Sequence, residues 1–126
     1  MRINIYVIVL SLLTPTMALA SSSDWREKLS SKSTPMVFDV SLFNINSNIM
    51  KKAALVAMVR RKWEIENIED TYVIGTYGGT KAMISFESAQ KITIGYIKDF
   101  EGLDNGWLVN LKKDMLYETA RCGNFE

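Results

Sequence analysis

The sequence predicts an α+β domain, with an antiparallel sheet of about four strands and two helices packed on one face, in the order β-α-β-β-β-α. Three observations lead to this fold class. Apolar residues recur every three or four positions between Ile49 and Trp63, which is the spacing of one helix face. The spacing changes to two over residues 63–96, as in strands. A second segment with helical spacing follows at residues 106–121.

The first 20 residues have the organisation of a cleavable secretory signal. Arg2 provides a positive start, residues 5–13 are apolar, and residues 18–20 form an A-x-A cleavage site. The polar residues 14–16 interrupt the apolar run, which is shorter than the roughly 18 to 20 residues that a membrane-spanning helix needs. We therefore expect cleavage after Ala20, a periplasmic or secreted location, and no stable membrane insertion afterwards.

The rest of the chain is long enough for one domain with its own core, which we place at residues 36–122. Residues 21–35 are rich in serine and charged side chains, so a flexible or weakly helical lead-in is expected there, and residues 123–126 form a tail. A first strand is expected within residues 36–45. Its buried face, at every second position, comprises Met36, Phe38, Val40 and Leu42.

The first helix is expected at residues 49–62. A short polar side chain just before a helix accepts a hydrogen bond from an unpaired backbone N–H, and Asn46, Ser47 or Asn48 is suited to this role. The stripe expected to face the core consists of Ile49, Ala53, Val56 and Val59, flanked by Met50, Ala57 and Trp63. The small alanines would let this helix lie close to a sheet.

Three or four further strands are expected in meander order, within residues 63–66, 72–77, 81–86 and 91–96. Gly78-Gly79 indicates a tight hairpin, because both central residues of the favoured turn need positive φ. A phosphate-binding loop would need more glycines and a helix directly after them.

The last helix is expected at residues 106–121, with Asp104 or Asn105 as its cap and Gly123 placed to end it. Its apolar stripe consists of Leu108, Leu111 and Met115. If both helices cover one face of the sheet, the opposite face is left open to solvent or to a partner. That face would present Lys81, Met83, Ser85, Lys91 and Thr93.

The chain contains no histidine, which removes the commonest general base and metal ligand and every Ser-His or Cys-His pair. Four carboxylates lie close together in the sequence: Glu64, Glu66, Glu69 and Asp70. They lack the spacing of a calcium loop, and on a strand the two glutamates share a solvent-facing side. We therefore expect no catalytic residues, no metal site and no cofactor.

The charge balance argues against nucleic-acid binding. Arg2 is the only charged residue of the signal segment, so the mature chain carries 14 basic and 14 acidic side chains. Binding to phosphates needs a surplus of basic residues on one face. The tightest basic run, residues 60–62, is expected to be a solvated helix end offset by the nearby glutamates.

Cys122 is the only cysteine, so no disulfide can form within the chain. The end of a helix disfavours a thiolate, which argues against a nucleophilic role. A spare thiol is expected, and a disulfide to a partner or a second copy is the alternative.

Four aromatic residues are the candidate ligand- or partner-binding residues: Trp63, Tyr77, Tyr96 and Trp107. Tryptophan combines a large apolar surface with one N–H donor, which suits it to anchor a ligand. For Trp63 and Trp107, core packing is the main expectation and anchoring is the alternative, because the two are expected to meet where helices and sheet converge.

Two short motifs carry a resemblance to a known group. The first helix ends in the basic-Trp sequence of residues 60–63, and a Trp-x-x-x-Leu sequence at residues 107–111 opens the last helix. The region from 49 to 119 thereby resembles small bacterial periplasmic proteins and lipoproteins of unknown function. The resemblance implies an envelope location and an α+β fold, and it implies no activity. The chain departs from that group in having no lipid-attachment cysteine near the cleavage site.

These observations favour a non-enzymatic binding module of the envelope, which contacts an envelope protein or a small ligand through an open sheet face or an edge strand. The alternative is a small-ligand carrier with Trp63, Trp107 and Tyr96 around an apolar pocket between helices and sheet. A third hypothesis is an enzyme that uses carboxylates alone, which would need two acids converging in a cleft.

Overall fold

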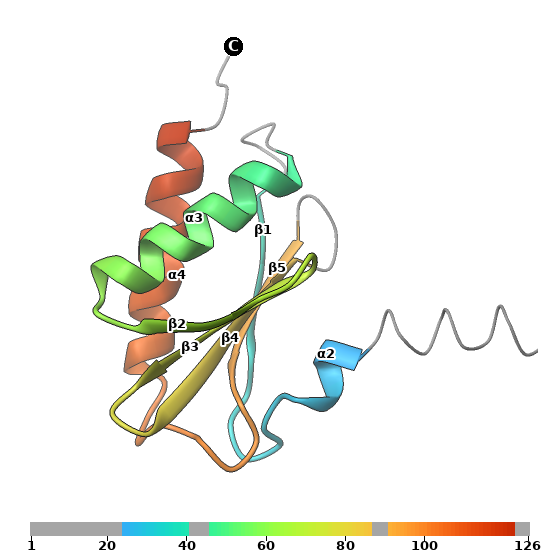
Figure 1. The fold of residues 1–126 in the computed structure, drawn as a ribbon, viewed down its shortest axis with the longest axis vertical. Helices are drawn as coiled ribbons and strands as arrows, with labels where there is room; N and C mark the ends of the chain where they lie inside the picture. Colours follow the sequence, from blue (N-terminus) through green and yellow to red (C-terminus); the bar gives the residue numbers. More distant parts are fainter. Residues whose placement is uncertain (1–23, 41–45, 87–90, 123–126) are drawn as a thin grey trace, which may run out of the picture.

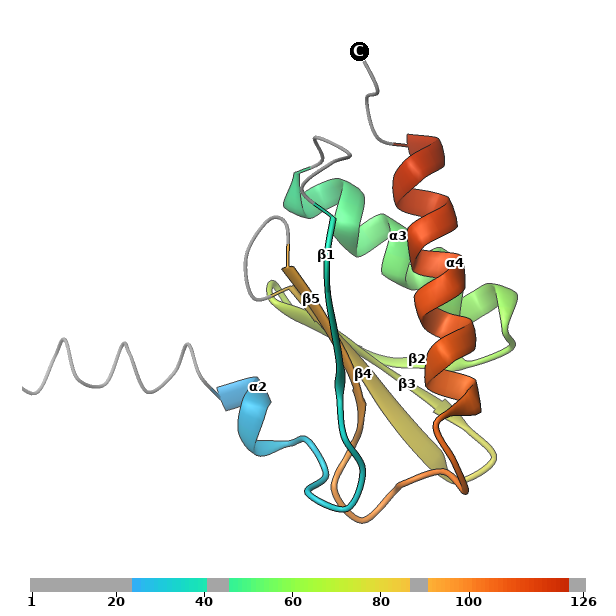
Figure 2. The same ribbon diagram turned by 180° about the vertical axis from the view of Figure 1, so that it is seen from behind.

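The computed structural model describes residues 24–40, 46–86 and 91–122 and confirms the α+β fold class (Figures 1 and 2). A five-stranded antiparallel sheet has the order β1-β5-β4-β3-β2. The strands are β1 (Met36–Asp39), β2 (Glu64–Ile68), β3 (Tyr72–Tyr77), β4 (Thr80–Phe86) and β5 (Lys91–Tyr96). Helices α3 (Ser47–Arg60) and α4 (Gly106–Cys122) pack together and on one face of this sheet, as predicted. Residues 1–20 and 123–126 lie outside the described residues.

The meander from β2 to β5 follows the predicted spacing closely. Gly78 and Gly79 connect β3 to β4 with φ values of 53° and 86°, which is the tight hairpin that the glycine pair predicted. β1 forms the edge of the sheet opposite to β2. It pairs with β5, and Phe38 lies opposite Ile92. The predicted first strand is thereby confirmed for residues 36–39, while residues 41–45 lie outside the described part.

Helix α3 begins where a polar cap was expected, since Asn46 Oδ1 accepts a hydrogen bond from the Ile49 N–H at 2.9 Å. The predicted apolar stripe is confirmed at Ala53 and at the flanking Met50 and Ala57, and it is wrong at Val59. Val59 is 62% exposed, whereas the buried positions are Met50, Ala53, Ala54, Ala57 and Met58. The helix turns its small and flexible side chains inward because alanines permit the closest approach to the sheet and to α4.

Helix α3 ends in a hydrogen-bonded reversal of the chain that sets the direction of Trp63. The Trp63 N–H donates to the Met58 carbonyl at 2.9 Å, and the Lys62 N–H donates to the Val59 carbonyl at 3.0 Å. This pattern is the Schellman motif, which needs a left-handed residue after the helix. Lys62 occupies that position with a φ of 68°.

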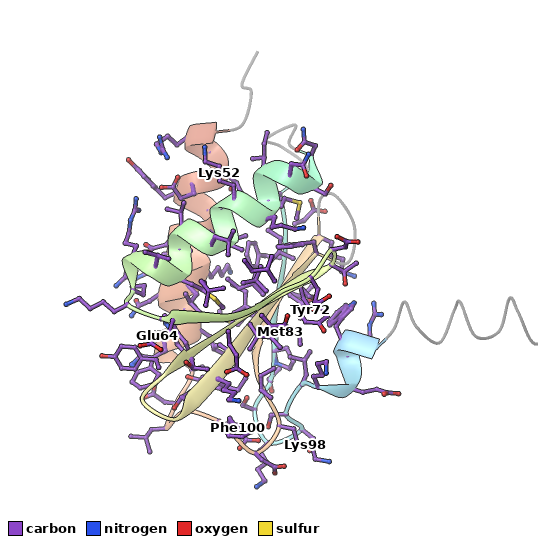
Figure 3. All side chains as sticks on the ribbon, in the orientation of Figure 1. Lys52, Glu64, Tyr72, Met83, Lys98 and Phe100 are labelled. Atoms are coloured by element: carbon purple, nitrogen blue, oxygen red, sulfur yellow. The ribbon has the colours of Figure 1, made fainter. Side chains whose placement is uncertain are left out.

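The face of the sheet opposite α3 and α4 is covered in part, which corrects the expectation of an open face. The short helix α2 (Asp24–Glu27) lies there, and its Trp25 is 4% exposed against Ile74 and Met83. Figure 3 shows Tyr72 and Met83 on the side of the sheet nearest α2. Part of the lead-in is therefore packed on the sheet, through Trp25 and Leu29, because tryptophan offers enough apolar area to hold a short helix.

The core lies between the sheet and the two long helices. The predicted stripe of α4 is confirmed, since Leu108, Leu111 and Met115 have no exposed surface. Asp104 Oδ1 accepts a hydrogen bond from the Gly106 N–H at 2.7 Å at the start of this helix. Among the helices in the described ranges, none is both long and apolar enough to cross a membrane.

Candidate aromatic binding site

Three of the four candidate aromatic residues meet at one end of the domain. Trp63 follows the end of α3, Tyr77 ends β3, and Trp107 lies in the first turn of α4. The ring centroids of Trp63 and Trp107 are 6.0 Å apart at 88°, and those of Tyr77 and Trp107 are 5.2 Å apart at 64°. Trp63 and Tyr77 complete the triangle at 5.8 Å. Such inclined, edge-to-face contacts are the favoured geometry of aromatic pairs.

The three rings differ in their exposure to solvent. Trp63 is 5% exposed and belongs to the core, which confirms the expectation of core packing for this residue. Tyr77 and Trp107 are 42% and 40% exposed, so the expectation that Trp107 packs in the core is wrong. Trp107 lies one position before Leu108, at the edge of the buried stripe of α4. Its side chain is therefore partly exposed to solvent. Trp63 thus forms a floor beneath two accessible rings.

Gly75 makes room for this floor. A Cβ atom at this position would lie 2.7 Å from Met58 Sδ and 3.3 Å from Trp63 Cβ. An alanine here would force the Met58 side chain to shift and Trp63 to move by a few tenths of an ångström, so glycine lets the end of α3 lie against β3 without such a displacement.

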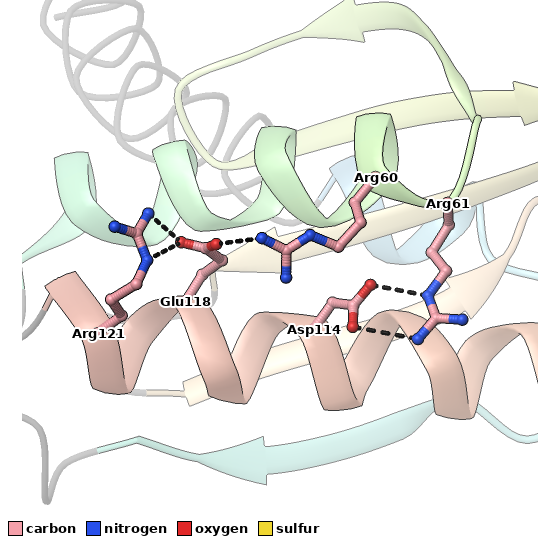
Figure 4. Close-up of polar contacts among 5 residues, drawn as sticks. All are labelled: Arg60, Arg61, Asp114, Glu118 and Arg121. Atoms are coloured by element: carbon pink, nitrogen blue, oxygen red, sulfur yellow. Dashed lines mark hydrogen bonds and ion pairs between the residues drawn. The ribbon is translucent and has the colours of Figure 1, made fainter.

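Arg61 and Asn110 complete a surface pocket of about 140 Å³ with the three aromatic rings. Arg61 is held in place by Asp114 of α4, whose Oδ2 accepts from Nε at 2.7 Å and whose Oδ1 accepts from Nη2 at 3.2 Å (Figure 4). These side-chain hydrogen bonds to Asp114 raise the pKa of Arg61, against the opposing effect of desolvation. The guanidinium is therefore charged and oriented, and its charge is balanced by Asp114.

A second ion-pair cluster lies beside the first, between the same two helices. Arg60 donates to Glu118 Oε1 at 2.9 Å, and Arg121 donates to Glu118 Oε2 at 2.7 Å (Figure 4). The Glu118 side chain is 1% exposed. The basic run is exposed, as expected for a solvated helix end. Its two arginines pair with α4, so the expectation that the carboxylates of residues 64–70 offset them is wrong. Asp114 and Glu118 are four residues apart and so lie on one side of the predicted last helix. This spacing is the sequence feature that could have indicated a pair of acidic partners for the two arginines.

Tyr96 lies away from the pocket. It is 1% exposed in the core, and its hydroxyl donates to the Asp104 carbonyl at 2.5 Å. Burial, with a smaller effect of the Asp104 charge, raises the pKa of this phenol. Tyr96 thereby secures the loop before α4, so the expectation that it lines a ligand site with the tryptophans is wrong.

The carboxylates singled out in the sequence show no convergence with one another. Glu66 accepts from Lys81 Nζ at 3.0 Å on the exposed side of β2, and Asp70 lies 3.9 Å from Lys51 Nζ. Within the described part of the chain, no three histidine, cysteine, aspartate or glutamate side chains form a group that could hold a metal ion. The Cys122 side chain lies outside the described residues.

No protein-family model matches the chain, and a search of curated proteins finds no significant match. Sequence reasoning identified Trp63, Tyr77 and Trp107, but it missed Arg61, Asn110 and Asp114.

Proposed function

We propose that the chain is an exported, non-enzymatic binding module of the bacterial envelope and that it holds its ligand or partner at the aromatic pocket. The observation that carries this proposal is the meeting of Trp63, Tyr77 and Trp107 beside an oriented arginine. Exposed tryptophan and tyrosine side chains over a well-packed floor are typical of residues that contribute most of the binding energy. The secretory signal of residues 1–20 supports the envelope location.

The position of the pocket favours this proposal over a carrier with an interior cavity. The side chains between helices and sheet that a carrier would need to separate are fully buried, among them Met58, Leu111 and Met115. The pocket instead lies at the surface, where two rings are about 40% exposed. A surface pocket suits a ligand that is one part of a larger molecule, because the remainder can extend into solvent.

Binding to envelope material tests the proposal. The full chain, exported with its own leader and recovered from the envelope or medium, is immobilised and exposed to envelope protein and cell-wall fractions. Trp107→Ala is expected to lose at least about tenfold in retained material, because it removes an accessible anchor. Leu103→Ala is the matched control, since Leu103 is fully exposed and lies outside the pocket. Equal retention by both variants would contradict the proposed site.

A further inference from the structure

We infer that the aromatic pocket takes one ring of a neutral saccharide, stacked on the exposed ring of Trp107 beside Tyr77 and hydrogen-bonded to Asn110 and Arg61. This inference rests on the proposed function and names its ligand class. The spacing of the rings, the charge balance, the polar lining and the size of the pocket each support it.

The ring spacing excludes a ligand that lies between the three aromatics. Their centroids are 5.2 to 6.0 Å apart, so the rings already contact one another. An aromatic cage for a quaternary ammonium needs room for the cation within about 6 Å of several ring faces at once. A flat ligand must instead lie against the outer surface of one accessible ring, because Tyr77 and Trp107 are inclined at 64° to each other.

The charge balance argues against an anionic ligand. Nε and Nη2 of Arg61, one fork of the guanidinium, are bound to Asp114. A carboxylate or phosphate is recognised best by an arginine whose fork and charge are both unused. At this site an anion would also approach the carboxylate of Asp114. The pocket therefore offers hydrogen bonds without a net charge.

The polar lining fits closely spaced hydroxyl groups. Nη1 of Arg61 takes no part in the pair with Asp114 and is a donor, and the Asn110 amide is both a donor and an acceptor. A pyranose ring presents C–H groups on its faces and hydroxyls around its rim. It can therefore cover an aromatic ring while its hydroxyls bond to both side chains. An apolar peptide side chain would leave these polar groups desolvated and unpaired, at a cost in affinity.

The volume suits one ring. The pocket measures about 140 Å³, well below the roughly 300–1,000 Å³ of sites for drug-sized ligands. A pocket of this size has room for one saccharide unit of a longer glycan, and the other units can remain in solvent.

Titration with defined oligosaccharides tests the inference. The exported protein is titrated by calorimetry with tetramers of N-acetylglucosamine, of β-1,4-linked glucose and of α-1,4-linked glucose. At least one tetramer is expected to bind with a Kd of about 1 mM or tighter, and Trp107→Ala is expected to weaken it at least about tenfold. Leu103→Ala is expected to bind as the wild type does.

A second variant separates a saccharide from a peptide side chain. Asn110→Leu keeps a side chain of similar size but removes the amide, so it should weaken the tetramer at least about tenfold. If an apolar side chain were the true ligand, this variant would instead strengthen binding of an aromatic tetrapeptide. Binding of the tetrapeptide with no binding of any tetramer would overturn the saccharide inference. The loss of envelope retention in Trp107→Ala would still support the pocket as the binding site, so the two failures are distinguishable.

Discussion

Arg61 and Asp114 join the end of α3 to α4 through two parallel hydrogen bonds, of 2.7 and 3.2 Å. This pair orients a side chain of the pocket and links two elements that bring aromatic rings to it. The Asp114 side chain is 10% exposed and that of Arg61 is 40% exposed, so solvent screens the interaction in part.

Asp114→Asn is expected to lower the free energy of unfolding by about 1 kcal/mol, because the charge is lost while the shape is retained. Urea denaturation measures the change. Asp70→Asn is the matched control, since Asp70 is fully exposed and 3.9 Å from Lys51; it should leave stability unchanged. Equal effects of the two substitutions would contradict a structural role for the Arg61–Asp114 pair.

Gly75→Ala is expected to destabilise the domain by about 1–3 kcal/mol, because the new methyl group overlaps Met58 and crowds Trp63. The cost should fall in a Met58→Ala background, where the nearest atom is absent, so the two substitutions should not be additive. Unfolding of both single variants and the double variant measures this coupling. The same cost in both backgrounds would mean that Gly75 is not in close contact with Met58.

Lys62→Gly is expected to stabilise the protein by about 0.5–1 kcal/mol. Lys62 has a φ of 68°, a conformation that glycine adopts without strain from a Cβ atom. Lys62→Ala keeps the Cβ atom and should bring no such gain. Thermal unfolding compares the two variants, and a gain in the alanine variant alone would contradict the assigned backbone strain.

Glu101 should stabilise the domain at neutral pH, and this contribution should be lost in acid. The Ser30 hydroxyl donates to Glu101 Oε2 at 2.5 Å and, as the largest cause, lowers the pKa of this carboxyl below its ordinary 4.5. A lowered pKa in the folded state adds stability above the ordinary pKa, and this contribution is lost as the pH falls through the folded value. The melting temperature of the wild type should therefore exceed that of Glu101→Gln at pH 7, and the gap should narrow below about pH 4.5. A gap that stays constant to about pH 3 would contradict this link.

The sequence predicted the fold well because spacing and turn chemistry act locally. The Gly78-Gly79 hairpin and the Asn46 cap each depend on a few neighbouring residues. The buried side of α3 could not be predicted in the same way, because apolar residues occur on several sides of this helix. Contacts with α4 and the sheet then decide that Ala54 is buried and Val59 is exposed.

The candidate site was predicted in part for the same reason. Tryptophan and tyrosine are conspicuous in any sequence, and three of the four chosen aromatics lie together. The pairing of Arg61 with Asp114 spans 53 residues and depends on how two helices pack. The prediction for Tyr96 was wrong because its side chain extends from β5 into the core, where the hydroxyl contacts the loop before α4.

The indole N–H signals of the three tryptophans show whether the aromatic pocket is the binding site. Trp63 and Trp107 belong to the pocket, while Trp25 lies on the opposite face of the sheet and serves as an internal control. Indole N–H signals of ¹⁵N-labelled protein are recorded as the best-binding tetramer or envelope fraction is added, and Trp107→Phe assigns one of them. Binding at the pocket should give saturable shifts for Trp107 and Trp63 and an unchanged signal for Trp25. Shifts confined to Trp25 would place the binding surface on the opposite face of the sheet and rule out the aromatic pocket.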